Sequence, residues 1–145
     1  MKGKMTARLL DKDGVCYDTF ETDNIVVNSG ESNLAAFMAE NNTATLYLMK
    51  YMAIGTGTTP PDEIQTALVN EVGVRITGVK SASGSVYQVV ATFPTNNPTT
   101  EVAITELGLF NQLGAGGTML NRLKFGVITK GTADQIEFTV QISID

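Results

Sequence analysis

The last run of the chain alternates strictly between apolar and polar residues, which is the pattern of a half-buried β-strand. Because successive side chains of a strand point to opposite faces, one face of this strand must cover a core. The other face meets water or a partner. The apolar positions are Ile136, Phe138, Val140, Ile142 and Ile144, and the polar positions between them are Gln135, Glu137, Thr139, Gln141 and Ser143.

Several shorter β-prone runs precede this strand. Residues 6–10 and 15–20 are joined by Asp11-Lys12-Asp13-Gly14, a hairpin signal because Gly accepts the positive φ of a tight turn. A second hairpin is expected from 71–80 and 85–93, closed by 81–84. Further strands are expected at 24–27, 51–54, 102–110 and 118–125, and a single helical turn at 66–68.

One segment has helical character. Asn28 is a candidate N-cap, with Glu31 three residues later as in a capping box. The apolar residues Leu34, Phe37 and Met38 follow at helical spacing and predict a stripe that packs into the core.

Seven to nine short strands separated by turns predict a mainly β fold. We expect an antiparallel β-sandwich, jelly-roll-like, with one short α-helix, formed by residues 1–145 as a single domain. The residues expected in its core are Ile54, Leu107, Leu109, Phe110, Phe125, Phe138 and Val140.

Composition excludes several function classes. Charged residues are 17% of the chain and the net charge is −5, so binding of nucleic acid through a basic face is not expected. Histidine is absent and there is one cysteine, which removes the commonest general base and any internal disulfide. We expect no enzyme, no cofactor and no metal site. No signal peptide is evident, and the longest apolar-leaning run is far shorter than a membrane helix requires.

Two motifs have both a chemical and a structural interpretation. Gly55-Thr56-Gly57 resembles a phosphate loop, but Pro60 and Pro61 follow in place of a Lys and a helix, so a tight turn is favoured. The hairpin acids Asp11, Asp13 and Asp18 are a hypothetical weak cation site, although a turn explains them better.

The other candidate reactive groups are carboxylates and a thiol. On one extended strand, Glu101 and Glu106 would face opposite ways unless a bulge intervened. Glu71 and Glu106 could instead meet across strands. We expect Cys16 to be a small core or semi-buried thiol.

Polar loops with few charges are the candidate contact surfaces, because a loop stiffened by proline loses little entropy on docking. An ordinary solvent-exposed loop is an equally good interpretation. A glycine-rich loop can also approach a neighbouring backbone closely. The candidates are Thr56, Thr58, Thr59, Pro60 and Asp62; Thr95, Asn96, Asn97 and Thr99; Gly114, Gly116 and Gly117; and Thr139 and Gln141 of the last strand.

Several short motifs follow one another along the chain in an order that is found in a known group of proteins. They begin with Lys12-Asp13-Gly14 and Asn24-Ile25-Val26-Val27-Asn28-Ser29-Gly30, continue through residues 52–60, 65–72, 104–111 and 117–122, and end with Ile128-Thr129-Lys130-Gly131. In this order they resemble a widespread group of tailed-bacteriophage virion proteins, over residues 2–144.

The resemblance implies a structural role in a phage particle. The group includes tail-collar or fibre-anchor proteins and stand-alone head-decoration or cement proteins. No repetitive shaft follows the motifs within the 145 residues, which favours a decoration protein that clips neighbouring capsid subunits. A tail, collar or baseplate adaptor is the alternative, and a glycan-binding module is a third.

The same role implies partners and a location. We expect a homo-oligomer, a trimer before a dimer, because closed symmetry matches the axes of a shell. Its partners would be the major capsid protein or tail and collar proteins, with neither nucleic acid nor membrane. The protein would be made in the bacterial host cytoplasm and incorporated into the virion.

Overall fold

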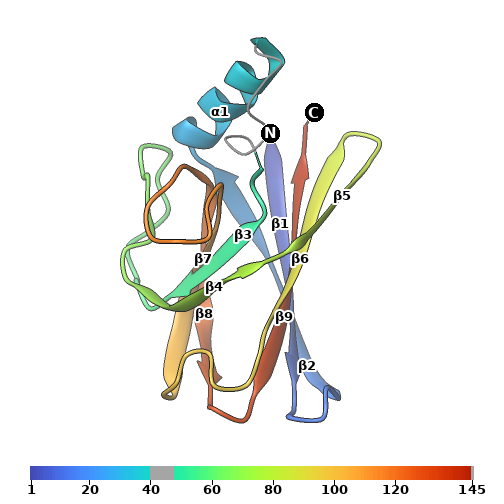
Figure 1. The fold of residues 1–145 in the computed structure, drawn as a ribbon, viewed down its shortest axis with the longest axis vertical. Helices are drawn as coiled ribbons and strands as arrows, with labels where there is room; N and C mark the ends of the chain where they lie inside the picture. The colour runs from blue at the N-terminus through green and yellow to red at the C-terminus, as the bar shows by residue number, and fades with distance from the viewer. Residues whose placement is uncertain (40–47, 145) are drawn as a thin grey trace.

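The computed structural model describes residues 1–39 and 48–144, and this part of the chain forms nine strands and one helix (Figure 1). The elements are β1 (Lys2–Leu10), β2 (Cys16–Val26), α1 (Asn28–Ala39), β3 (Tyr51–Gly55), β4 (Glu71–Thr77), β5 (Val79–Ser83), β6 (Val86–Phe93), β7 (Val102–Phe110), β8 (Met119–Lys130) and β9 (Gln135–Ser143).

The strands form two antiparallel sheets that share one strand, which confirms the predicted sandwich with one short helix. Sheet A has the order β2-β1-β9-β6-β5, and sheet B has the order β4-β3-β7-β8-β2. The first part of β2 pairs with β1, whereas Ile25 and Val26 at its end pair with β8. Residues 24–27 are therefore mostly the continuation of β2, and the prediction of a separate strand there was wrong.

The main core lies between the two sheets. Phe138 of β9 is fully buried, and its ring meets Phe93 edge-on with centroids 5.9 Å apart. The predicted core residues Ile54, Leu107, Leu109 and Val140 are buried in the same cluster, and Phe125 packs against it partly buried. Ile144 is 50% exposed, so the buried alternation of the last strand ends at Ile142.

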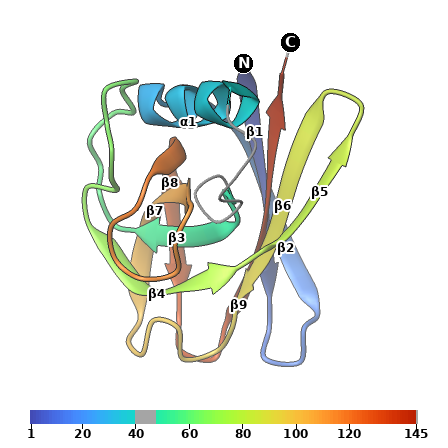
Figure 2. The same ribbon diagram turned by 45° about the horizontal axis from the view of Figure 1, so that its top comes forward.

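A second, smaller cluster covers the outer face of sheet B. Ala53 alternates along β3 with the core residues Met52 and Ile54, and so points away from the main core. It packs with Leu68 and Phe110, and with Val27 and Met119. Figure 2 shows that the two long connections around residues 56–70 and 111–118 lie on this side of the molecule.

The predicted strand 71–80 is divided at Gly78. Residues before it belong to β4, which pairs with β3, and residues after it belong to β5, which pairs with β6. A Cβ at Gly78 would collide with Val89 and lie 3.1 Å from the Lys50 carbonyl oxygen. The missing side chain therefore lets the chain cross between the sheets, so only the second half of the run forms the expected hairpin.

The helix exists, but its predicted core stripe does not. Its first turn packs closely, with Gly30 against the backbone of Leu120 and the Ser29 hydroxyl donating to the Met119 carbonyl at 2.8 Å. Of the predicted stripe, Leu34 is half-buried. Phe37 is 53% exposed and Met38 is 80% exposed. The first helical bond runs from the Glu31 N–H to the Val27 carbonyl, so Val27 takes the cap position and the helix begins at Asn28, the residue predicted as its cap.

The remaining connections contain no further long element within the described residues. Residues 66–68 do not form the expected helical turn, because the connection from β3 to β4 is irregular there. Among residues 1–39 and 48–144, no helix combines the length and the apolar character that crossing a bilayer requires.

Replacement of Phe138 by Ala tests the core. We expect Phe138→Ala to lower the free energy of unfolding by about 3–5 kcal/mol, because it removes a fully buried ring and leaves a cavity. Urea denaturation followed by fluorescence or circular dichroism measures this loss. As a control, Val127→Ala at a 61% exposed site should change stability by less than about 0.5 kcal/mol.

Candidate functional site

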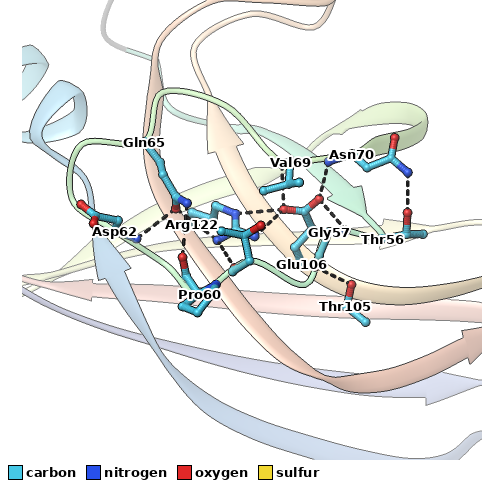
Figure 3. A network of polar contacts seen from close by, with 11 residues as sticks. Thr56, Gly57, Pro60, Asp62, Gln65, Val69, Asn70, Thr105, Glu106 and Arg122 are labelled. Atoms are coloured by element: carbon cyan, nitrogen blue, oxygen red, sulfur yellow. Dashed lines mark hydrogen bonds and ion pairs between the residues drawn. The ribbon is translucent and has the colours of Figure 1, made fainter.

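A buried ion pair organises the outer face of sheet B (Figure 3). Glu106 of β7 and Arg122 of β8 are both fully inaccessible to solvent, and Arg122 Nε donates to Glu106 Oε2 at 2.9 Å. Arg122 Nη2 lies 2.8 Å from the same oxygen as an ion-pair contact, without the geometry of a hydrogen bond. The two charges therefore compensate each other out of contact with water.

The carboxylate of Glu106 also binds the backbone of the connection between β3 and β4. It accepts hydrogen bonds from the N–H groups of Gly57 at 2.9 Å, Val69 at 3.0 Å and Asn70 at 2.8 Å. Thr105 adds a hydroxyl bond of 2.7 Å to the Gly57 carbonyl. One side chain thus joins the two ends of a loop that is far from it in sequence.

Arg122 holds the middle of the same loop. Its Nη1 donates to the Thr59 carbonyl at 2.9 Å and to Gln65 Oε1 at 3.1 Å. Gln65 in turn donates to the Pro60 carbonyl at 3.3 Å and accepts from the Asp62 N–H at 3.0 Å. The predicted contact residues 56–62 are therefore held in place by hydrogen bonds to buried side chains of the sheet beneath them.

The motif Gly55-Thr56-Gly57 binds an anion that the protein itself supplies. A Cβ at Gly55 would lie 2.5 Å from both Glu106 Oε1 and the Asn70 carbonyl oxygen. A Cβ at Gly57 would lie 2.5 Å from the same carboxylate oxygen and collide with Val69. Both glycines are required by the close approach of Glu106, so the backbone N–H meets a carboxylate where a phosphate loop would meet a phosphate.

The surroundings of Glu106 lower its pKa. Desolvation on burial acts in the opposite direction, raising the pKa, but the N–H groups of Asn70 and Val69, the Arg122 side chain and the N–H of Gly57 outweigh it. Because each of these groups donates to the ionised carboxylate, they favour the charged form.

A second buried arginine fixes the loop between β7 and β8. Arg75 of β4 forms a two-pronged pair with Glu71, with both N–O distances at 2.9 Å, and its guanidinium lies 3.8 Å from the centroid of the Phe110 ring. Its Nη1 donates to the carbonyls of Gln112 at 2.9 Å and Gly116 at 2.8 Å. The glycine-rich loop is therefore tied to β4 by a charged side chain that is 5% exposed.

The third predicted loop, residues 94–100, covers the free edge of β4. The side-chain amide of Asn97 accepts from the Val74 N–H and donates to the Val74 carbonyl, both at 2.9 Å. This pairing replaces the neighbouring strand that an edge strand lacks. Lys130, which is 1% exposed, donates to the Pro94 carbonyl at 2.8 Å. Desolvation lowers the pKa of its ammonium group, and Asp134 partly offsets this effect.

In the structure, the three predicted loops all lie close to β4 or to the residues just before it. Of their predicted contact residues, Thr58, Thr59, Pro60, Asp62, Asn96, Thr99, Gly114, Gly116 and Gly117 are exposed, and Thr56 and Thr95 are half-buried. Asn97 is buried, and its amide is used inside the molecule. Thr139 and Gln141 lie elsewhere, on the outer face of sheet A.

The candidate carboxylates have separate surroundings. Glu101 is exposed, Glu71 pairs with Arg75, and Glu106 pairs with Arg122. The pairing of β7 with β8 does contain a register shift, between Ile104 and Glu106. In that register Glu106 lies opposite Lys124, and its side chain reaches Arg122 further along β8 rather than a second acid.

The first hairpin has the predicted turn, but its cysteine differs from expectation. Within the described residues, no three His, Cys, Asp or Glu side chains come close enough to hold a metal ion together. Asp11 Oδ1 accepts from the N–H groups of Asp13 and Val15, each at 2.9 Å, as a turn residue does. Cys16 is exposed rather than semi-buried, because the start of β2 lies at the edge of sheet A.

The basic residues that hold the loops were not identified from the sequence. Arg75, Arg122 and Lys130 are basic residues in strands of a chain with few charges. Arg122 is preceded by Met119-Leu120-Asn121 and followed by Leu123. A charge inside an apolar strand is a signal for a buried pair, although it does not name the partner.

No protein-family model, curated protein or solved structure matches the chain.

Breaking the buried pair tests its role. We expect Glu106→Gln to lower the free energy of unfolding by about 3–5 kcal/mol, because it leaves the Arg122 charge buried without its counter-ion. Thermal and urea denaturation measure this loss. Glu137→Gln is the matched control: its partner Arg8 has a side chain that is 46% exposed, so the loss should be below about 1 kcal/mol.

The lowered pKa of Glu106 predicts a loss of stability in acid. Its ionisation stabilises the fold fully above the ordinary carboxyl value of 4.5, and this contribution disappears as the pH falls through the lower pKa of the folded protein. Melting temperatures measured from pH 7 downwards should fall in this window. The fall should be smaller in Glu106→Gln and unchanged in Glu137→Gln. An equal fall in all three proteins would contradict the assignment.

Proposed function

We propose that the protein is a structural component of a tailed-bacteriophage virion, a decoration or cement protein that docks on the head shell and opposes internal pressure. It would act through buried contact area, without chemistry. The loops around β4, residues 56–62, 95–100 and 114–117, would be its contact surface. The order of motifs along the chain supplies the phage context.

The internal fixing of these loops is the observation that carries the proposal. Each loop is held by a buried or nearly buried polar side chain: Arg122 and Glu106, Asn97, or Arg75. Their backbone is ordered when the protein folds. Docking therefore costs little further conformational entropy, and the available binding energy goes into affinity.

The chemistry of the exposed loop residues supports the same role. Thr58, Thr59 and Thr99 are exposed and uncharged. Covering a hydroxyl costs much less than covering a charge, and its hydrogen bond is easily replaced at an interface. A surface of this kind suits extended contact with a protein shell.

Cryo-electron microscopy of the intact phage particle tests the location. We expect density for the sandwich on the head, with the loops around β4 toward the shell. Particles lacking the protein should release DNA at a lower temperature, and the purified protein should restore them. Density confined to the tail would overturn the head role and support an adaptor of the tail, collar or baseplate. Absence from the particle would overturn both roles.

The double variant Thr58→Lys, Thr99→Lys tests the contact surface. Both side chains are exposed, so the melting temperature should stay the same, whereas binding to depleted particles should weaken by about tenfold or more because two ammonium groups must be desolvated. Co-sedimentation with particles measures binding. Thr129→Lys, at an exposed site on β8, is the control and should bind as the wild type does.

A further inference from the structure

The two outer faces of the sandwich differ in what covers them. Sheet B carries the connections 56–70 and 111–118, whereas no described loop crosses the outer face of sheet A (Figures 1 and 2). The side chains on that face point away from the core because they alternate with buried residues: Val90 follows Val89, and Thr139 and Gln141 flank Val140.

The register of the strands arranges this face in rows without charge at its centre. Thr6, Thr139, Val90 and Val79 are cross-strand neighbours from β1 to β5. In the adjacent row, Gln141 Nε2 donates to Gln88 Oε1 at 2.9 Å. Val79 is 74% exposed. Glu137 is the one charged residue at the outward positions of β5, β6 and β9 in the described chain.

Apart from Glu137 on β9, the charges on this face lie on β1 and β2, and the six charges balance. The bases Lys2, Lys4 and Arg8 face the same way as the acids Glu21, Asp23 and Glu137. Lys4 pairs with Glu21 at 3.2 Å and Arg8 with Glu137 at 3.1 Å. The whole chain has a net charge of −5, so its excess negative charge lies elsewhere. Two copies can therefore meet on this face without net repulsion.

The face is also of the right size for self-association. Five strands about 4.8 Å apart, each contributing about eight residues with a rise of about 3.4 Å, cover roughly 650 Å². A standard protein interface buries about 800 Å² on each partner. An uncharged centre with charged pairs at one side also follows the usual division of an interface into core and rim.

We infer that the outer face of sheet A binds a second copy of this chain, face to face, in a two-fold symmetric dimer. Two of the predicted contact residues, Thr139 and Gln141, lie at its centre. A contact of this kind uses the same surface on both copies, so two copies satisfy it completely. It therefore predicts a dimer and not a trimer. The inference deepens the proposed function and rests on it for its biological setting: the loops around β4 stay free for the shell.

Molar mass in solution tests the dimer without any phage particle. Size-exclusion chromatography with light scattering and sedimentation velocity, at micromolar concentration, should show a dimer for the full chain. Val90→Glu puts one carboxylate from each copy into the uncharged centre of the proposed contact. It should weaken the dimer by at least tenfold and leave the melting temperature of the monomer unchanged. Thr139→Glu should weaken the dimer in the same way. Agreement between the two variants shows that the loss does not come from a local distortion at Val90.

Val127→Glu is the matched control, since Val127 is a 61% exposed strand residue of sheet B. It should remain a dimer. A monomeric or trimeric wild type would overturn the inference, as would a dimer that survives both substitutions or dissociates equally with Val127→Glu. Any of these results leaves the location on the particle to be decided by microscopy, so the inference and the proposed function fail separately.

Discussion

The buried pair of Glu106 and Arg122 is the contact on which the shape of the outer surface depends. A charge in the interior is stable only when its hydrogen-bonding capacity is met, and here the partners are supplied by a loop up to 63 residues away in sequence. The loop therefore cannot move without exposing a buried charge. Two glycines, Gly55 and Gly57, complete the arrangement because their missing side chains admit the carboxylate.

Polar side chains also hold the loops next to the edge strand β4. Arg75 fixes one loop through backbone carbonyls, and Asn97 fixes another through the backbone of Val74. Three of the ten lysine and arginine residues are buried, and each of them donates to a backbone carbonyl. These three positive charges order loops inside the molecule, and the lightly charged surface that remains can be covered at low cost.

The sandwich consequently has two outer faces with different physical properties. Sheet B carries ordered loops with exposed hydroxyl groups, and sheet A carries an uncovered and electrically balanced face. A protein that must bind a shell and also a copy of itself needs two surfaces that do not compete. The proposed docking and the proposed dimer use one face each.

Local pattern determined which residues form strands and which of them face the core, because the alternation of β9, the Asp13-Gly14 turn and the helix start depend on neighbouring residues. Only the tertiary structure decided where β2 passes from one sheet to the other and why the strand is interrupted at Gly78. It also decided that Phe37 and Met38 remain exposed. The candidate loops were predicted as polar loops stiffened by proline, but the buried side chains that hold them were not. These are Arg75, Asn97, Glu106 and Arg122, whose partners are distant in sequence and become neighbours only when the sheets pair.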